Sequence, residues 1–409
     1  MARLKEIRSA AARKARRVKR APLSERLPAF IGGPANAAEL LAGLKVAVIG
    51  VGSVGRRIAL HLARMSVDAL SLIDPGTLKP ESLLTYEIAS LDIGDAKTAN
   101  AARLCKDISP STTVFTYEGG IHDVPDAALA DADLIVMALD NIAAEVETGR
   151  RATALGIPLV HAALVGETMS TEVRVYANRD KANPCPACGL SEAERDAMNR
   201  GVKFRCAPDG RRREQNIGPP TMSLSFLCSA AADIALAQIV RYVLKLGKPV
   251  ADTSVQTCLY THHSVVSPLT RNPNCGCPHV VYERVISPRP LADCTLREVA
   301  ALAGVDVGAD GVALTVDDLI FCDRGACKCA ASRPVRRFVP VGGAAGRCPS
   351  CGEPIRADPF FSFARVPASE LKSEIDRPVR ELGAASAESV IVRASNQGYL
   401  VRQSGKEAG

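Results

Sequence analysis

Apolar and polar positions alternate in blocks from residue 44 onward. Short apolar runs without a polar break, such as Val46 to Ile49, are typical of strands that are buried on both faces of a sheet. The predicted strands are 45–49, 69–73, 112–116, 134–139 and 158–164, and the predicted helices lie near 55–65, 95–107 and 142–155. This order of elements predicts an α/β fold with a doubly wound, largely parallel sheet.

The first predicted strand leads into a glycine-rich turn. Gly50, Gly52 and Gly55 form the pattern G-x-G-x-x-G between this strand and the next helix. Glycines there allow a tight turn, close approach of backbone amides to a phosphate, and close packing of the helix on the strand. Asp74 ends the second apolar run, where a carboxylate can accept a hydrogen bond from a ribose hydroxyl. We expect a nucleotide site rather than an ordinary tight turn, and these residues do not distinguish NAD from ATP.

Two further charged residues lie at the ends of predicted elements. Lys97 opens a helix after Gly94, where an ammonium group could reach phosphate oxygens; an exposed lysine in a first helical turn is the alternative. Asp140 ends an apolar strand and is followed by Asn141. A carboxylate at the carboxyl end of a parallel strand faces the ligand crevice and can hold Mg²⁺.

The composition, with 47% hydrophobic and 23% charged residues, is ordinary for a globular protein. The longest apolar helix candidate, 224–246, carries Asp233 and Arg241, and the N-terminus lacks an apolar secretory segment. We therefore expect no membrane span and a cytoplasmic location.

The net charge of +7 is concentrated at one end of the chain. Residues 1–20 contain nine Lys or Arg and one acid, Glu6, so the remaining residues sum to −1. A basic arm on a neutral body is not typical of a general nucleic-acid binder. The arm is either frayed and solvated, or it contacts nucleotide phosphate across a dimer or an acidic protein partner.

Fourteen cysteines in such a chain favour metal or thiol chemistry over disulfides. Cys185 and Cys188 form one close pair, and Cys275 and Cys277 form another nearly ninety residues later. Because folding can bring distant pairs together, these four predict a tetrahedral four-thiolate zinc site.

A second group of cysteines lies nearer the C-terminus. Cys327 and Cys329 are separated by eighteen residues from Cys348 and Cys351, a spacing typical of a zinc ribbon. Cys322 is a spare or an alternative ligand.

Cys206 stands alone between the first two cysteine pairs. Arg205 and residues 211–213 surround it with positive charge, which stabilises a thiolate. The prolines and glycines of this segment predict an exposed loop. The other cysteines outside the pairs lie in apolar contexts, and we expect them to be buried: Cys105, Cys228, Cys258 and Cys294.

Taken in order, these motifs resemble the adenylating family of ubiquitin-activating enzymes, the ThiF/MoeB superfamily, and the chain is identified as a bacterial-type member. The motifs are GVGSVG, Asp74, Gly94-x-x-Lys97, LDN at 139–141, CPAC, the lone Cys206, a long apolar helix and NPNCGC. The resemblance covers roughly residues 40–285. It implies that the three glycines and Asp74 bind ATP, that Lys97 meets the phosphates, and that Asp140 holds Mg²⁺. It also implies that the first two cysteine pairs bind zinc and that Cys206 attacks the adenylated partner.

Two positions depart from the family pattern. An Asn-Leu-x-Arg segment usually follows the ribose aspartate, whereas this chain has Ser82 to Thr85 there. Glu145 stands where an arginine often follows the Asp-Asn pair. These replacements remove arginines that would balance the negative charge of the phosphates. Candidates to supply this positive charge instead are Arg56, Arg57, Lys79 and the basic arm.

The resemblance implies activation of the C-terminal carboxylate of a small ubiquitin-like protein. An acyl-adenylate would form, pass to Cys206 as a thioester, and transfer to a conjugating enzyme; a homodimer is also implied. The alternatives are a sulfur-carrier adenylyltransferase without thioester transfer, a non-catalytic zinc-stabilised scaffold, and an NAD-dependent dehydrogenase. The expected domains are a basic arm and linker (1–40), an adenylation domain (41–288), a zinc ribbon module (289–365) and a polar tail (366–409).

Overall fold

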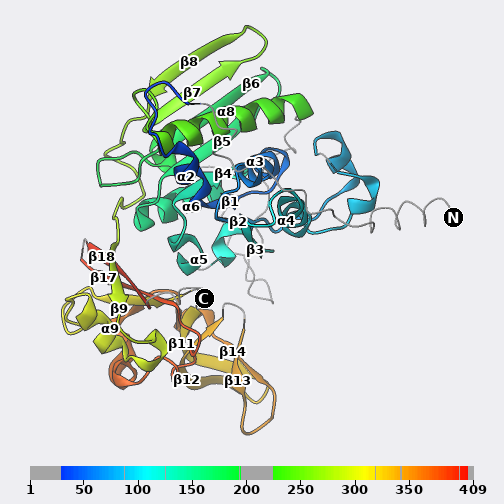
Figure 1. Cartoon of the computed structure of the whole chain (residues 1–409). Coiled ribbons are helices and arrows are strands. Elements are labelled where there is room, and N and C mark those ends of the chain that lie inside the picture. The colour runs from blue at the N-terminus through cyan, green and yellow to red at the C-terminus, as the bar shows by residue number, and fades with distance from the viewer. Residues whose placement is uncertain are drawn as a thin grey trace, which may run out of the picture.

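The computed structural model describes residues 29–403, with gaps at 87, 125, 193, 195–223, 318, 341–342 and 396. Within this part the chain forms an N-terminal α/β unit and a C-terminal β-rich unit (Figure 1). The basic arm, and the segment that contains Cys206, lie outside the described residues.

One sheet forms the centre of the N-terminal unit. Its strands are β1 (Lys45–Ile49), β2 (Ala69–Ile73), β3 (Thr113–Tyr117), β4 (Leu134–Met137), β5 (Leu159–Val165), β6 (Ser170–Tyr176), β7 (Thr253–Cys258) and β8 (His263–Pro268). Their spatial order is β3-β2-β1-β4-β5-β6-β7-β8. The pairs from β3 to β5 are parallel, and β6, β7 and β8 extend the sheet in antiparallel fashion. The predicted doubly wound, largely parallel α/β fold is therefore confirmed.

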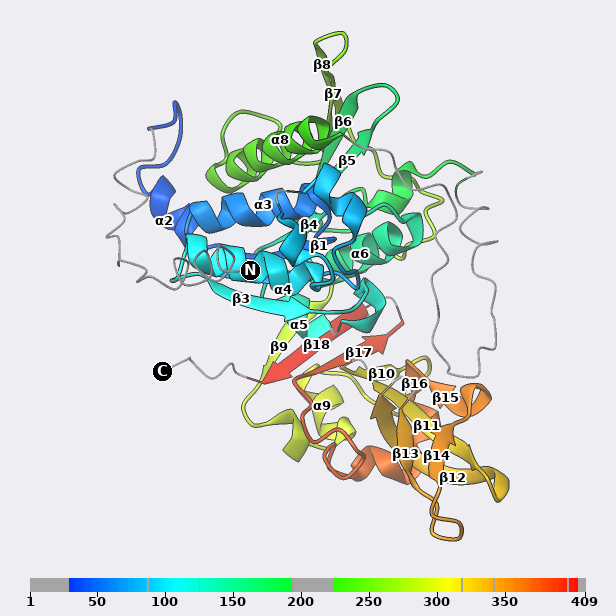
Figure 2. The same ribbon diagram turned by 90° about the vertical axis from the view of Figure 1, so that its right-hand side faces the viewer.

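Helices cover both faces of this sheet (Figure 2). They are α2 (Ala37–Ala42), α3 (Ser53–Arg64), α4 (Lys97–Ile108), α5 (Asp126–Ala130), α6 (Ile142–Leu155) and α8 (Ser225–Leu244). Val46 and Val48 of β1 point into the core shared with α3, α4 and α8, while Ala47 and Ile49 point into the core shared with α5 and α6. Because successive strand side chains alternate between faces, an unbroken apolar run serves both cores.

Among the described helices, α8 alone is long and apolar enough to cross a membrane by length and composition. It packs on β5 and β6 and beside α3. Ala232, Ala235 and Ile239 are completely buried there, so this helix contributes to the core of the sheet unit.

The C-terminal unit contains two smaller sheets and short helices. Its elements are β9 (Glu283–Ser287), α9 (Leu296–Leu302), β10 (Ala313–Val316), β11 (Leu319–Cys327), β12 (Ala330–Pro340), β13 (Ala344–Arg347), β14 (Pro354–Ala357), β15 (Ser362–Phe363), β16 (Val366–Pro367), α10 (Ala368–Leu371), β17 (Ser389–Ala394) and β18 (Gln397–Gln403). One sheet has the order β16-β10-β17-β18-β9, and the other has the order β12-β11-β14-β13, with β15 paired to β11.

The structure differs from the expected domain limits at two places. Strand β9 lies before the expected boundary at residue 288, yet it pairs in parallel with β18 of the C-terminal unit. The expected tail after residue 365 supplies β16, β17 and β18, so it is an integral part of this sheet.

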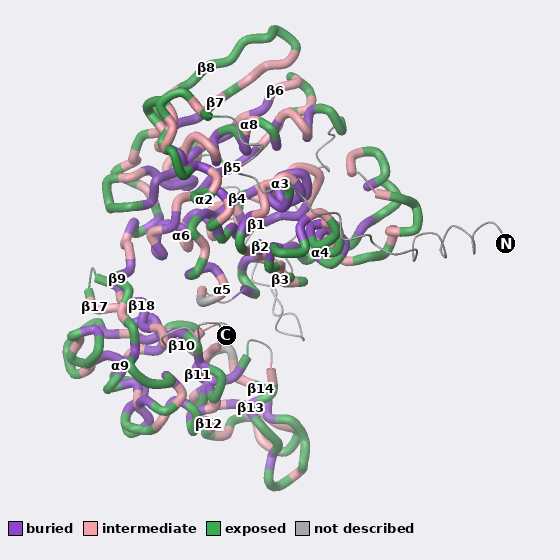
Figure 3. Tube along the Cα trace, in the orientation of Figure 1, coloured by how far each residue is buried: buried purple, intermediate pink, exposed green. Residues whose placement is uncertain are grey.

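Strands β17 and β18 lie between the two units (Figures 1 and 2). Ile391 and Leu400 pack into the core of the α/β unit, whereas Val392 and Val401 pack into the core of the C-terminal unit. Figure 3 shows buried, purple segments both in the central sheet and in the C-terminal unit.

Candidate active site and metal centres

The glycine turn connects β1 to α3. Gly50 has φ +87°, a left-handed conformation that favours glycine, and a Cβ on Gly50 would collide with the Ala138 carbonyl group. A Cβ on Gly55 would collide with the carbonyl oxygen of Gly50. Gly52 is the N-cap residue of α3. The turn therefore brings the N-terminus of α3 tightly against the ends of β1 and β4, a geometry suited to an anion.

Asp74 is tied directly to this turn. One carboxylate oxygen accepts the Val51 N–H at 2.8 Å and the other accepts the Gly76 N–H at 2.7 Å. Lys97, the first residue of α4, places Nζ 3.8 Å from the same carboxylate. Burial lowers the pKa of Lys97, but Asp74 and Tyr86 outweigh burial and raise it. Lys97 therefore stays protonated beside the glycine turn, and it is not the exposed first-turn lysine of the alternative interpretation.

Asp140 lies at the carboxyl end of β4 and is exposed. The next residue, Asn141, caps α6 by accepting N–H groups from Ala143 at 2.9 Å and Ala144 at 3.3 Å. Asp140 contributes to the raised pKa of Lys97, so the two charges lie within electrostatic reach of each other. The structure thus gathers the predicted nucleotide-site residues at one edge of the sheet.

The two arginines that were candidates to supply charge are directed to the interior. Arg56 is 1% exposed, and its Nη2 donates to Asn100 at 2.7 Å. Arg57 donates to Ser225 at 2.7 Å and to the Ser53 carbonyl at 2.9 Å. Both guanidinium groups therefore stabilise the packing of α3 against its neighbours.

Glu145 lies in the first turn of α6, where the family pattern has an arginine. Its carboxylate is 3.7 Å from the buried ring of His161 on β5. Burial raises the pKa of Glu145 to about 7; Arg174 opposes this effect, while Asp140 and Glu194 add to it. Burial and Arg174 together lower the pKa of His161 to about 3, so this imidazole is neutral.

Replacing Glu145 by glutamine is expected to flatten the pH dependence of stability between pH 5 and 8. A folded-state pKa of about 7 against an ordinary 4.5 means that the folded protein binds more protons than the unfolded chain in this window. The free energy of unfolding of the wild type should then fall by about 2–3 kcal/mol as the pH rises through the window. Urea unfolding at several pH values measures this slope.

The matched control for this experiment is Glu147→Gln on the same helix. Hydrogen bonds and charge from Arg150 and Arg151 outweigh burial and lower the pKa of Glu147 to about 2. Glu147→Gln should change the free energy of unfolding by the same amount at pH 5 and at pH 8. If the free energy of unfolding depends on pH in the same way in the wild type and in Glu145→Gln, the raised pKa of Glu145 is contradicted.

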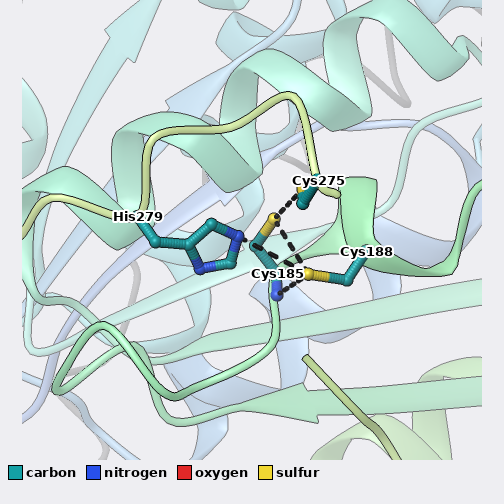
Figure 4. Close-up of side chains that lie close together, drawn as sticks. All are labelled: Cys185, Cys188, Cys275 and His279. Carbon is teal, nitrogen blue, oxygen red and sulfur yellow. Dashed lines mark hydrogen bonds between the residues drawn. The ribbon is translucent and has the colours of Figure 1, made fainter. Parts of the chain in front are cut away.

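The first two cysteine segments meet beside α6, as Figure 4 shows. The donor atoms of Cys185, Cys188, Cys275 and His279 all lie within 4.8 Å of one another. Cys188 lies in a short 3₁₀ turn, Pro186–Gly189, and Cys185 is the N-cap residue of this turn, whereas Cys275 and His279 come from the loop before β9. Sequence reasoning overlooked His279, although it follows Cys277 by only two residues; Cys277 is not in this mutually close set.

The second cluster contains the four cysteines expected for a ribbon. The sulfur atoms of Cys327, Cys329, Cys348 and Cys351 lie within 4.8 Å of one another, between β11, β12 and the β13–β14 hairpin. Cys322 is completely buried and donates to the Arg324 carbonyl at 3.1 Å, so it is not in the mutually close set. Both clusters have the donor chemistry of zinc sites.

Among the remaining cysteines, Cys105, Cys228 and Cys294 are completely buried, as expected. Cys258 differs because it ends β7 at a hairpin and is only partly covered. Hydrogen bonding with Thr261 lowers the pKa of Cys258 to about 7.

Comparison with curated proteins identifies two kinds of adenylyltransferase. Adenylyltransferase and sulfurtransferase uba4 of Emericella nidulans is 28% identical over 151 residues, which are 35% of this chain and 31% of that protein. Molybdopterin-synthase adenylyltransferase of Escherichia coli is 27% identical over 152 residues, which are 37% of this chain and 60% of that protein. The match thus spans less than two thirds of either relative.

Among solved structures, E. coli MccB aligns with a TM-score of 0.46 at 17% identity, covering 59% of this chain and 66% of that chain. The ThiF family model matches residues 25–279, more than half of the sequence, and the chain therefore belongs to the ThiF family.

Proposed function

We propose that this protein is an ATP-dependent adenylyltransferase that activates the C-terminal carboxylate of a small ubiquitin-like protein. The observation that carries the proposal is the convergence of the glycine turn, Asp74, Lys97 and Asp140 at one edge of the parallel strands. The two curated relatives are both described as adenylyltransferases, which supports the reaction type.

Each residue has a defined part in this reaction. The N–H groups of the turn and of the start of α3 bind phosphate oxygens. Each carboxylate oxygen of Asp74 accepts one backbone N–H and retains a lone pair for a ribose hydroxyl. Asp140 would hold Mg²⁺, whose charge stabilises the phosphates when it is bound.

The partner carboxylate attacks the α-phosphorus, an acyl–phosphate bond forms, and pyrophosphate leaves. No proton needs to be removed, because the nucleophile is already an anion. Catalysis therefore depends on positioning and on charge, and Lys97 is the cation placed for the phosphate oxygens.

We further propose that the acyl group passes from AMP to the sulfur of Cys206. A thioester forms, AMP leaves, and the cysteine of a conjugating enzyme then receives the acyl group. The cationic sequence around Cys206 supports this role.

A sulfur-carrier adenylyltransferase is the second candidate. The names of both relatives favour it, since one is also a sulfurtransferase and the other serves molybdopterin synthase. In this case the product would remain an adenylate or pass through a persulfide. We also propose a homodimer in which the basic arm 1–20 approaches the neighbouring site, which light scattering of the full chain can test.

The proposal is tested by ATP–pyrophosphate exchange with the full-length protein and its candidate small-protein partner. We expect exchange that depends on Mg²⁺ and on the free C-terminus of the partner, and no tight NAD binding by calorimetry. Binding of ATP without exchange would support a non-catalytic scaffold. Tight binding of NAD without binding of ATP would favour a dehydrogenase and contradict the proposal.

A further inference from the structure

The cluster of Cys185, Cys188, Cys275 and His279 has the dimensions of a metal site. With Zn–S bonds of about 2.3 Å and Zn–N bonds of about 2.0 Å, a tetrahedron has S···S edges of about 3.8 Å and S···N edges of about 3.5 Å. The sulfur of Cys185 lies 3.9 Å from that of Cys188 and 3.7 Å from that of Cys275. His279 Nε2 lies 3.5 Å from the sulfur of Cys188. These separations match tetrahedral edges and are too long for disulfide bonds.

The imidazole of His279 is oriented as metal-binding histidines are. It is 2% exposed, and its Nδ1 lies 3.1 Å from the Asn183 carbonyl oxygen. Because a carbonyl only accepts, Nδ1 carries the proton, and Nε2 presents its lone pair to the sulfur atoms. His279 also has φ +49°, an uncommon conformation for a residue with a side chain.

Asn183, whose backbone carbonyl orients His279, is itself fixed by hydrogen bonds of its side chain. The Asn183 side chain accepts N–H groups from Arg179 at 2.8 Å and Asp180 at 3.0 Å, and it donates to Asp252 at 2.8 Å. Asp252 in turn accepts the Ala177 N–H at 2.9 Å. These hydrogen bonds fix the position of Asn183, and therefore the position of the backbone carbonyl that accepts a hydrogen bond from the His279 imidazole.

The sulfur atoms of this cluster also accept hydrogen bonds from nearby N–H groups. The Cys185 N–H donates to Cys188 Sγ at 3.5 Å, and the Cys277 N–H donates to Cys275 Sγ at 3.5 Å. Arg271 Nη1 lies 3.8 Å from Cys188 Sγ. Three thiolates, a neutral imidazole and Zn²⁺ carry a net charge of −1, which this one guanidinium can balance.

We propose that the first zinc is held by three thiolates and the His279 imidazole, and that Cys277 supports the site through its backbone N–H. This set differs from the four thiolates that the sequence predicted and that the family resemblance implied. Cys277 packs in the same small cluster and its thiol interacts with that of Cys185, so it is the competing fourth ligand, although it is not in the set whose donor atoms are all mutually close. The proposal concerns the metal alone and does not depend on the proposed enzymatic activity.

Cadmium-113 NMR of the full-length protein, loaded with this metal in place of zinc, distinguishes the two sets. Each sulfur ligand that replaces nitrogen moves the cadmium resonance downfield, and the ribbon cluster provides a four-thiolate reference in the same chain. The wild type is expected to give two resonances, one at the four-thiolate position and one upfield of it. His279→Cys should move the second resonance to the four-thiolate position.

Matched variants assign the ligand. Cys277→Ala should retain both resonances and about two metals per chain, whereas His279→Ala should weaken binding at the first site at least tenfold in a chelator competition. Two four-thiolate resonances in the wild type would overturn the proposal, even if His279→Ala fails to fold. Loss of the upfield resonance in Cys277→Ala would overturn it as well.

Discussion

Replacing Lys97 by alanine lowers the rate of ATP–pyrophosphate exchange by about a hundredfold or more, which is the expected result with the largest effect on catalysis. The ammonium group is the cation that the structure places 3.8 Å from Asp74 beside the glycine turn. Loss of one charge-stabilising contact in such a site costs about 3 kcal/mol of transition-state stabilisation. Asp140→Ala should have a similar effect, since the Mg²⁺ contact would be lost. Exchange assays at saturating ATP measure both.

The matched control is Lys106→Ala, which removes an exposed lysine from the last turn of the same helix. It should leave exchange unchanged. The unfolding midpoint of Lys97→Ala should remain close to that of the wild type. Full exchange activity in Lys97→Ala would contradict the assigned role of this lysine.

Replacing Cys206 by alanine is expected to abolish every reducible adduct with the small modifier while leaving ATP–pyrophosphate exchange intact. Adenylate formation needs no thiol, whereas thioester formation needs a thiolate to attack the adenylate. Cys206→Ser should also lose the reducible adduct, because an oxygen ester is not cleaved by thiols. Non-reducing gels followed by treatment with a thiol measure the adduct.

Cys258 provides the stringent control for this experiment. It is partly exposed, and hydrogen bonding with Thr261 lowers its pKa to about 7, so it is the most reactive competitor among the described cysteines outside the two metal clusters. Cys258→Ala should retain the adduct, as should alanine at the buried Cys105. An adduct that persists in Cys206→Ala and disappears in Cys258→Ala would show that the nucleophile was misassigned.

The central sheet could be predicted because its signals are local. The apolar run of β1 and its glycines each reflect a constraint within a few residues, namely burial on both faces and a turn that excludes a Cβ. The ribbon cysteines could be predicted for the same reason, since both pairs lie in one short segment. The positions of Asp74 and Asp140 required only the rule that carboxyl ends of parallel strands share an edge.

The sequence by itself therefore determined the α/β class, the glycine turn with Asp74 and the grouping of the four ribbon cysteines, because short-range patterns encode these features. Only the tertiary structure decided which donor joins Cys185, Cys188 and Cys275, since Cys277 and His279 are both close in sequence and backbone geometry selects between them. Only the tertiary structure also showed that the expected tail is part of a sheet, because its strands β17 and β18 contribute side chains to two separate hydrophobic cores. Long-range packing has no local signature, so burial of Glu145 and partial exposure of Cys258 also emerged only when distant segments met.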